Sequence, residues 1–478
     1  MKRDKQQATS NKELSSKQVL VVGLGKSGLA ALRLLQKLGC NSLFAAELKS
    51  EEPQRRLAAQ LESEGVAVEL GPHRRSLLAG KELVVTSPGV VWDKPPLTWA
   101  REEGLPVISE IELASRYCRG KMVAVTGTNG KSTTVSLIHH LLKSAGRHSV
   151  LCGNIGEPFA DNVLSVGAGD IVVLEISSFQ LLGCTTFRPF LSVILNVTTN
   201  HLDWHPDFAT YLEAKKRIFQ RQGVSDLLAL NVQDPTLKCL AVPSNGPRRL
   251  WFGWGEQARG VFAKGEWMVT TLRGKEEKLF PLSDIPLLGA HNTSNAAAAA
   301  LAVFSLGLPA EAIRENLRSF RGLEHRLEEV ARSGGVTFIN DSKATTVESA
   351  RQALLAIREP ILLIAGGRDK GSDFTFLRET ISQRVKKVFL IGEARPKIRK
   401  AFEGYVAIEE ADGLEAAVEK AARQAKQGET VLLSPMCASF DLFENFEARG
   451  RAFKEAVYRL TEKQKRCVTS DSPSFSSS

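Results

Sequence analysis

The sequence lacks any long hydrophobic run. No apolar stretch in its 478 residues approaches the roughly 20 that a membrane-spanning helix needs. Residues 1–17 are polar and charged, without the apolar centre of a secretion signal. We therefore expect a cytoplasmic protein that does not span a membrane and begins with a disordered lead over residues 1–17.

Paired cysteines and clustered basic charge are also missing. The seven cysteines are scattered without paired spacing, which is typical of free thiols in a reducing compartment. The formal net charge is +10, but the basic residues are dispersed. Nucleic-acid-binding proteins usually cluster such charge or interleave it with aromatic residues. We therefore expect no nucleic-acid partner, and the mild basic bias suits a polyanionic small substrate.

The sequence does contain short apolar runs that alternate with helical patterns. This alternation indicates α/β domains with mostly parallel sheets, and the chain is too long for a single core. Strands are expected at 18–22, 42–46, 67–70, 83–86, 107–108, 171–174, 191–195, 336–339, 361–364, 387–391 and 430–433, and helices at 26–38, 110–117, 207–222 and 293–306. We place domains at 18–110, 111–322 and 323–465, and a serine-rich disordered tail at 466–478.

The strongest local motif is GTNGKST at residues 127–133, directly after a predicted strand. Its glycine turn would point backbone N–H groups and a helix N-terminus at an anion, with Lys131 and a hydroxyl beside them. That combination is typical of nucleoside triphosphate and Mg²⁺ sites. The usual motif has a glycine where this chain has Val125, so the loop is a compact variant.

A second glycine-rich turn, GLGKSG at residues 23–28, also joins a strand to a helix. Glu47 ends the next strand, where dinucleotide-binding domains carry an acid for a ribose hydroxyl. The turn is compatible with a dinucleotide, with another nucleotide diphosphate, or with close helix–strand packing alone. The turn at 87–89 ends another strand of this domain and is expected to face the same crevice.

Acidic and histidine side chains follow two strands of the central domain. Glu175 ends a buried strand and is a Mg²⁺ partner for the Ser132 hydroxyl, a helix-capping acid or a solvated strand end. The loop at 196–205 carries His201, Asp203 and a second histidine. Zinc would be a first hypothesis for that loop, but no third soft ligand stands at a motif spacing.

Lys215 lies in the middle of an apolar helical stripe that includes Tyr211 and Phe219. A lysine in that place either reaches the rim with its ammonium, has a shifted pKa, or is chemically converted. Polar loops also follow three strands of the last domain, at 340–346, 366–371 and 434–440. Several such loops in one domain favour a binding crevice.

With these motifs together, the chain resembles the Mur ligase family. The resemblance rests on GTNGKST, Glu175, the 196–205 loop, GAHNTSN at 289–295 and the His-Arg pair at 325–326. It implies a UDP-binding Rossmann-like domain, a central P-loop ATPase and a C-terminal Rossmann-like domain. Two loops, NDSKAT at 340–345 and SPMCASF at 434–440, resemble the family member that adds D-glutamate.

The implied activity is an ATP-dependent ligation of D-glutamate to UDP-N-acetylmuramoyl-L-alanine through an acyl phosphate, in peptidoglycan precursor synthesis. ATP and two Mg²⁺ ions are the implied cofactors, and we expect a monomer. The resemblance implies a carbamylated Lys215, which would turn that cation into an oxygen ligand.

The resemblance also assigns roles to individual residues. Catalytic roles fall to Lys131, Glu175, His201 and Lys215, and metal binding to Ser132, Glu175, His201 and Lys215. The ATP site would comprise Gly127, Thr128, Asn129, Gly130, Lys131, Ser132, Thr133, Asn292, Arg326 and Asp341. The UDP substrate would contact Gly25, Ser27, Glu47, Gly89, Asn154 and His201, and D-glutamate would contact Lys343, Thr345, Lys370, Ser439 and Phe440.

Some positions depart from the family pattern, and other functions compete with this one. Glu47 stands where aspartate is common, Leu48 replaces a frequent threonine, and Phe440 replaces a usual leucine. The rivals are a sister Mur ligase that adds another amino acid, folylpolyglutamate synthetase, an NAD-dependent dehydrogenase and a GTPase switch. NDSKAT argues against the sister ligase, and the second nucleotide motif has no purpose in a dehydrogenase. The N-terminal glycine-rich domain is unexplained by the synthetase, and the guanine-reading tetrapeptide of a GTPase is missing.

Overall fold

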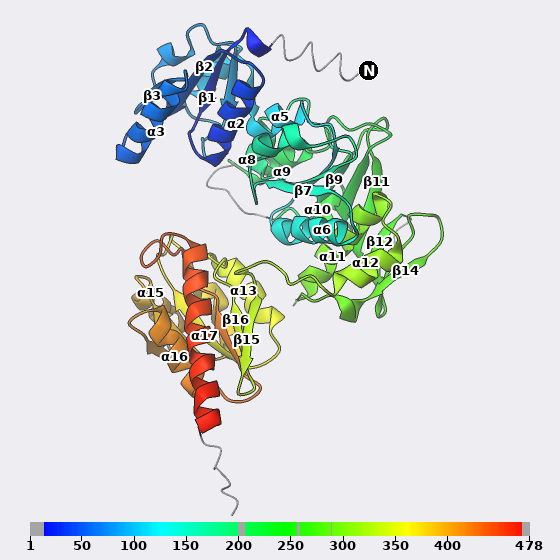
Figure 1. The fold of residues 1–478 in the computed structure, drawn as a ribbon. Coiled ribbons are helices and arrows are strands. Elements are labelled where there is room, and N and C mark those ends of the chain that lie inside the picture. The colour runs from blue at the N-terminus through cyan, green and yellow to red at the C-terminus, as the bar shows by residue number, and fades with distance from the viewer. Residues whose placement is uncertain (1–13, 199–205, 256–258, 288, 471–478) are drawn as a thin grey trace, which may run out of the picture. The chain divides into compact units, whose positions relative to one another are not determined.

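The computed structural model describes residues 14–198, 206–255, 259–287 and 289–470, and these residues form three β-sheets with helices packed against them (Figure 1). The α/β class and the three-domain architecture are thus confirmed. By their internal contacts the residues group into two compact units. One holds Met1–Ile285 with Thr293–Phe320, and the other holds Pro286–Asn292 with Arg321–Ser478. The first unit contains two of the sheets. The domain boundaries at 110/111 and 322/323 stay predictions.

The first sheet is parallel throughout, in the order β3-β2-β1-β4-β5, which is the doubly wound order of Rossmann-like folds. Both of its faces are buried: Val19 and Val21 pack into one core, and Leu20 and Val22 into another. Such two-sided burial explains why its strands are continuous apolar runs. Its elements are β1 (Gln18–Val22), α2 (Lys26–Lys37), β2 (Ser42–Glu47), α3 (Glu52–Ser63), β3 (Ala67–Leu70), β4 (Leu83–Thr86), α4 (Leu97–Glu102), β5 (Val107–Ser109) and α5 (Glu110–Ser115).

The central sheet runs β14-β13-β12-β11-β10-β9-β6-β8-β7. It is parallel except at β12-β13-β14, where two antiparallel pairings end the sheet. Its strands are β6 (Lys121–Thr126), β7 (Ser149–Gly153), β8 (Ile171–Glu175), β9 (Leu191–Ile194), β10 (Leu227–Asn231), β11 (Arg248–Trp254), β12 (Gly260–Lys264), β13 (Trp267–Thr270) and β14 (Glu277–Pro281). Its helices are α6 (Lys131–Ser144), α7 (Phe159–Asn162), α8 (Ser178–Leu182), α9 (Phe208–Lys216), α10 (Pro235–Lys238), α11 (Ala290–Ser305) and α12 (Ala310–Leu317).

The third sheet, in the second unit, runs β15-β16-β20-β17-β18-β19, with an antiparallel edge strand β15. Leu363 and Ala365 of β17 pack into one core, and Leu362 and Ile364 into the other. The long helix α17 packs against α16 and the β15-β16 side of the sheet (Figure 1). The elements are β15 (Glu328–Ser333), β16 (Val336–Asn340), α13 (Val347–Ala356), β17 (Ile361–Gly366), α14 (Arg378–Arg384), β18 (Val385–Ile391), α15 (Arg395–Phe402), β19 (Ala407–Glu410), α16 (Leu414–Gln424), β20 (Thr430–Leu433) and α17 (Phe446–Ser470).

The structure corrects one predicted helix. The pattern predicted a helix over 207–222, but α9 ends at Lys216. The following turns use three-residue hydrogen bonds, from Ile218 N to Lys215 O and from Phe219 N to Lys216 O. The Ile218 carbonyl instead accepts a hydrogen bond from the buried Ser192 hydroxyl of β9. Tertiary contacts thus tighten the chain where the sequence pattern continues.

Parts of the two predicted disordered ends are ordered. Leu14 is buried against the first sheet, although it belongs to the expected lead. At the other end α17 continues through Ser470, so residues 466–470 are helical rather than part of a disordered tail. Residues 1–13 and 471–478 lie outside the described chain. Within the described residues, no helix is both long and apolar enough to cross a membrane.

Candidate active site

The GTNGKST loop joins β6 to α6 in the first unit. Gly130 precedes the helix with a left-handed φ of 83°, and a Cβ there would lie 2.4 Å from the side-chain oxygen of Asn295. Gly127 approaches β9, since its Cβ would lie 3.0 Å from that of Leu195. Both glycines are therefore required by geometry, and the loop leads its backbone into a helix N-terminus.

Asn196, just after β9, holds this loop in shape. Its side-chain oxygen accepts hydrogen bonds from the backbone N–H groups of Thr128 and Asn129, at 3.0 and 2.8 Å. Its amide nitrogen donates to the Asn129 carbonyl at 3.1 Å. Sequence reasoning placed Asn196 in a polar loop but assigned it no role. One asparagine thus pairs with both N–H and carbonyl groups of the loop backbone, which preorganises the loop before a ligand binds.

Two lysines converge on the same loop. Lys131 Nζ donates to the carbonyl oxygens of Gly127 and Thr128, both at 3.0 Å. Lys215 Nζ, from α9, donates to the Gly127 carbonyl at 3.0 Å. The side-chain nitrogens of Lys131 and Lys215 therefore share one carbonyl oxygen of the loop, which places both lysines beside the expected phosphate site.

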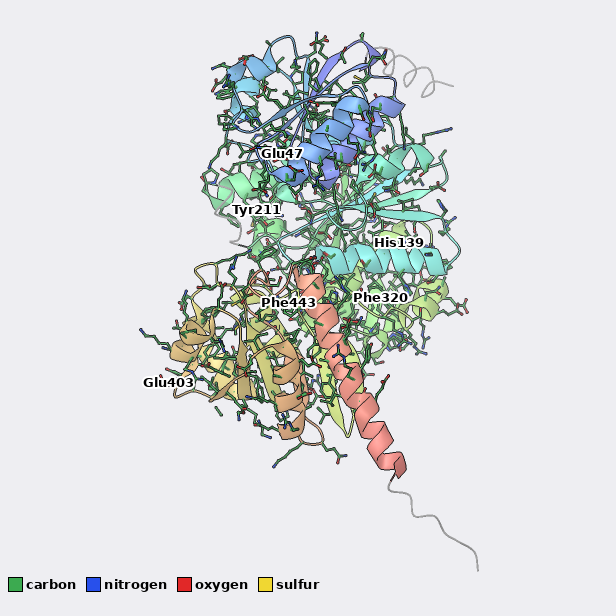
Figure 2. All side chains as sticks on the ribbon, turned by 60° about the vertical axis from the view of Figure 1, so that its left-hand side comes forward. Glu47, His139, Tyr211, Phe320, Glu403 and Phe443 are labelled. Carbon is green, nitrogen blue, oxygen red and sulfur yellow. The ribbon has the colours of Figure 1, made fainter. Side chains whose placement is uncertain are left out.

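Lys215 is buried rather than extended to the rim. Its exposed fraction is 1%, and Nζ lies 4.4 Å from the ring centre of Tyr211, labelled in Figure 2. Burial lowers the Lys215 pKa well below its ordinary range, and the charge of Lys131 lowers it further. Of the three alternatives from the sequence, reaching the rim is wrong and a shifted pKa is supported. Chemical conversion stays a prediction.

Glu175 ends β8 with an exposed fraction of 2%. One carboxylate oxygen accepts a hydrogen bond from the Asn154 side chain at 2.8 Å, whereas the other has no protein partner among the described residues. The helix-capping alternative is wrong, because Ser177 caps α8 together with Gln180. A buried carboxylate oxygen left open fits a metal ligand.

The predicted metal ligands are only partly described. Ser132 is buried in the first turn of α6, in the same unit as Glu175 and Lys215. His201 lies outside the described residues, as do Asp203 and the second histidine of that loop. Among the described residues, no group of three His, Cys, Asp or Glu side chains is placed to hold a metal ion. A cation here would therefore rely on Glu175, hydroxyl oxygen and a modified Lys215.

The turn at 23–28 uses its glycines for packing. A Cβ on Gly28 would lie 1.9 Å from the carbonyl oxygen of Gly23, so helix and strand approach too closely for a side chain. The Glu47 carboxylate, labelled in Figure 2, accepts hydrogen bonds from the backbone N–H groups of Leu24 and Lys49, at 2.8 and 3.1 Å. The predicted acid therefore braces the turn with both oxygens.

The turn at 87–89 belongs beside this glycine-rich turn, as predicted. A Cβ on Gly23 would lie 3.0 Å from the Ser87 Cβ, and one on Gly25 would lie 3.8 Å from the Ser87 hydroxyl. Ser87 also lines a pocket together with Ser109 and Gln180. Of the predicted UDP contacts in this region, Gly25 and Gly89 are exposed and Ser27 is partly buried. Their contact with UDP stays a prediction.

In the second unit, Asp341 follows β16 and is buried. It accepts hydrogen bonds from the Ser434 hydroxyl at 2.9 Å and the Leu327 N–H at 3.3 Å. Burial raises the Asp341 pKa to about 7, while the Ser434 bond and the charge of Arg326 oppose the rise. The charge of Arg326 also lowers the pKa of His291, after burial. Asp341 and His291, the chain neighbour of Asn292, thus both lie within electrostatic reach of Arg326, and the contacts of Asn292, Arg326 and Asp341 with ATP stay predictions.

The three polar loops of the second unit are joined at the ends of β16, β17 and β20. Met436 N donates to the Ala344 carbonyl at 2.9 Å, and Arg368 and Ala438 exchange backbone hydrogen bonds. The three loops are therefore adjacent, as their places at strand ends predicted, and the binding crevice stays a prediction. The predicted D-glutamate residues on the loops differ in exposure: Ser439 is buried, Lys343 and Thr345 are partly buried, and Lys370 and Phe440 are exposed.

Sequence reasoning missed Arg449, which is buried behind two of these loops on α17. Arg449 shows the same sequence pattern as Lys215, a charged residue in an apolar helical stripe. Phe446, Arg449 and Phe453 stand at helical spacing on one stripe, so a charged residue interrupts an apolar face.

Comparison with known proteins agrees with this architecture. Three family models match the chain: "Mur ligase MurD-like, N-terminal domain" over 17–109, "Mur ligase middle domain" over 125–303, and "Mur ligase, glutamate ligase domain" over 325–437. A UDP-N-acetylmuramoylalanine--D-glutamate ligase of Acidobacterium capsulatum is 45% identical over 93% of this chain and 97% of its own. One from Pelotomaculum thermopropionicum is 41% identical over 94% and 99%.

Solved structures support the fold. UDP-N-acetylmuramate-alanine ligase MurC from Thermotoga maritima has a TM-score of 0.56 at 19% identity, covering 93% of this chain and 99% of its own. MurF ligase from the same organism, in complex with ADP, has a TM-score of 0.57 at 17% identity, covering 95% and 97%. At these identities the likeness concerns the fold alone.

Three α/β domains, with a P-loop on the central sheet above a buried lysine and carboxylate, define a nucleotide-using enzyme of the ligase class. The matches over nearly the whole length then place it more narrowly: this chain belongs to the Mur ligase family.

Proposed function

We infer that this chain is an ATP-dependent ligase that joins D-glutamate to UDP-N-acetylmuramoyl-L-alanine in peptidoglycan precursor synthesis. The observation that carries the amino-acid assignment is the match to D-glutamate ligases at 45% and 41% identity over more than nine tenths of the chain. The loops at 340–345 and 434–440 favour the same amino acid.

The reaction consists of two displacements. The L-alanyl carboxylate attacks the γ-phosphorus of ATP, and the bond to the bridging oxygen breaks to release ADP. The D-glutamate amine then attacks the acyl carbon, loses a proton and expels inorganic phosphate, leaving an amide. Carboxylate and triphosphate are both anionic, so the first step needs positive charge and fixed orientation. The P-loop N–H groups, Lys131 and the start of α6 fit that requirement.

Mg²⁺ is part of this proposal. Ser132 and Glu175 would hold one ion, and Glu175, His201 and a carbamylated Lys215 would hold a second. The fit rests on the open, buried oxygen of Glu175 and on hydroxyl oxygen, since Mg²⁺ prefers oxygen ligands. When bound, Mg²⁺ would neutralise phosphate charge.

Carbamylation of Lys215 has a chemical rationale in its burial. CO₂ adds to a neutral amine, and burial lowers the Lys215 pKa, which favours the neutral form. The product carries a negative charge and two oxygens. Its charge would pair with Lys131, whose Nζ shares the Gly127 carbonyl with Lys215.

Substrate contacts complete the proposal. Asn154, already bonded to Glu175, would touch the muramoyl substrate, and Gly25, Ser27, Glu47 and Gly89 would contact UDP. Asn292, Arg326 and Asp341 would contact ATP. D-glutamate would contact Lys343, Thr345, Lys370, Ser439 and Phe440.

The rival functions are weaker. A dehydrogenase would use the glycine-rich turn and Glu47 for a dinucleotide, but it would leave the P-loop, Glu175 and the buried Lys215 unexplained. A sister ligase would share the P-loop, Glu175 and Lys215, so only the amino-acid loops and the relatives argue against it. We also propose that the protein is cytoplasmic and monomeric. Light scattering on the purified chain tests the second point, and a dimer mass would contradict it.

The function is tested by phosphate release with ATP, Mg²⁺, UDP-N-acetylmuramoyl-L-alanine and a panel of single amino acids. We expect release to depend on D-glutamate, with L-glutamate, L-lysine and diaminopimelate as controls at equal concentration. Release that depends on another amino acid would contradict the D-glutamate assignment. Release that ignores the muramoyl substrate would contradict the ligase reaction itself.

A further inference from the structure

Arg449 of α17 is a buried cation, with an exposed fraction of 1%. Its guanidinium is held by neutral oxygen acceptors, and no ion pair to it occurs within the described residues. Burial lowers its pKa to about 10, so the side chain stays charged near neutral pH. The charge of Asp441 acts on Arg449 from beyond ion-pair distance and partly offsets the effect of burial. A buried charge without a close ion pair still costs stability, and an apolar residue of similar volume would usually be better tolerated. Packing of α17 alone therefore does not explain an arginine here.

The guanidinium joins two of the predicted glutamate loops. Nε donates to the Ser342 hydroxyl at 3.0 Å and one terminal nitrogen donates to the Ser342 carbonyl at 2.9 Å. The other terminal nitrogen donates to the Cys437 carbonyl at 3.1 Å. A third loop is also close, because a Cβ on Gly367 would lie 3.2 Å from that nitrogen. The planar guanidinium of Arg449 thus fixes the separation between the loops after β16 and β20. The loop after β17 lies next to the same guanidinium.

The residues it holds adjoin the proposed glutamate contacts. Ser342 precedes Lys343, and Cys437 lies two residues before Ser439. The first turn of α17 adds two contacts: Phe446 accepts a hydrogen bond from the Ser342 hydroxyl at 2.8 Å, and its ring centre lies 5.4 Å from Lys343 Nζ. A lysine at position 449 would keep the charge, but it would lose the fork that reaches both loops together.

We propose that Arg449 is a positioning residue for the amino-acid substrate, and that it sets the spacing between the 340–345 and 434–440 loops. The proposal rests on the proposed function, since those loops are assigned to D-glutamate there. A shift of about 1 Å in positioning groups is enough to weaken binding and rate by large factors.

The test is steady-state kinetics of the full-length chain, varying each substrate in turn. For Arg449→Met we expect KM for D-glutamate to rise about tenfold or more, with KM for ATP and for UDP-N-acetylmuramoyl-L-alanine within about twofold of wild type. Arg459→Met is the matched control, because Arg459 lies on the same helix, is 60% exposed and pairs with Glu415. It should leave all three KM values unchanged.

Arg449→Lys separates charge from geometry and serves if the methionine variant does not fold. We expect Arg449→Lys to raise KM for D-glutamate by a smaller factor than Arg449→Met does. Added guanidinium should partly lower the raised KM of Arg449→Met. An unchanged KM for D-glutamate in a folded variant would overturn the proposal, as would an equal rise in all three KM values. Failure of the proposed function shows separately, as a wild-type enzyme that does not depend on D-glutamate.

Discussion

Lys215 is the residue whose environment departs furthest from that of an ordinary lysine. It is buried, donates to the Gly127 carbonyl and lies over the Tyr211 ring, with Lys131 on the same carbonyl. Two cations this close repel each other, so an uncharged or negatively charged group at position 215 would relieve the site. Carbamylation would supply the negative charge.

We predict that Lys215→Ala lowers kcat on the order of 100-fold or more, about 2.7 kcal/mol of barrier, because the proposed oxygen ligand is lost. Bicarbonate or a short carboxylic acid should partly restore phosphate release by occupying the space with a carboxylate. Lys216→Ala is the control, since Lys216 pairs with Glu213 nearer the surface. Full activity of Lys215→Ala would contradict the proposed carbamylation of Lys215.

At the scale of residues, the sequence is informative where a charged side chain stands in an otherwise apolar helical stripe. Lys215 was identified because a charge stood on an apolar stripe, and its burial bears out the unusual environment. Glu47 was identified by spacing, but spacing does not reveal that its carboxylate is occupied by Leu24 and Lys49. Arg449 carried the same signal as Lys215 and was overlooked among the many charges of the last helix.

At the scale of elements, the P-loop and the loop after β9 are joined by side-chain hydrogen bonds. The P-loop is held from the neighbouring loop by Asn196, whose side chain bonds to both Thr128 and Asn129. The apolar runs predicted β6 and β9, but their adjacency depends on sheet order, which local sequence does not encode. The three antiparallel-paired strands β12, β13 and β14 were missed for a related reason. They are four or five residues long, and charged residues stand at the end of β12 and at the start of β14.

We predict that Asn196→Ala raises KM for ATP about tenfold, because three hydrogen bonds that preorganise the loop are lost. Asn162→Ala, whose side chain bonds only to its own helix, is the matched control and should leave KM unchanged. Equilibrium binding of an ATP analogue measures the effect directly. Equal affinity in the two variants would show that the loop keeps its shape without Asn196.

At the scale of the whole molecule, Glu112 of α5 ties the first sheet to the central one. Its side chain is fully buried and accepts backbone hydrogen bonds from Thr185, Thr186 and Phe187, besides pairing with Arg116. Burial opposes its ionisation, but the Thr186 bonds and the Arg116 charge outweigh burial and lower the Glu112 pKa. The first two sheets accordingly belong to one compact unit.

We predict that Glu112→Ala lowers the free energy of unfolding by about 3 kcal/mol, because several buried donors lose their acceptor. A lowered pKa means that the wild-type contribution is present above pH 4.5 and is lost as pH falls through the folded-state value. Urea unfolding at pH 7 and pH 3 should therefore show the difference between variant and wild type shrinking in acid. Glu62→Gln, on the exposed face of α3, should match wild type at both pH values, and a pH-independent gap for Glu112→Ala would contradict the linkage.

The order of domains along the chain could be predicted from the sequence because strands buried on both faces are continuous apolar runs. The division into two compact units could not, since contacts such as those of Glu112 join residues far apart in sequence. The likeness to the Mur ligase family supplied residue roles that spacing alone left open, notably for Asn154 and Lys343.

The most direct test of the central claim follows an oxygen atom. If ATP activates the L-alanyl carboxylate as an acyl phosphate, ¹⁸O in that carboxylate must pass to the phosphate that D-glutamate displaces. Mass spectrometry of the released phosphate should therefore show one ¹⁸O per turnover in the presence of D-glutamate. Phosphate without ¹⁸O, formed at the same rate as the amide product, would contradict the account.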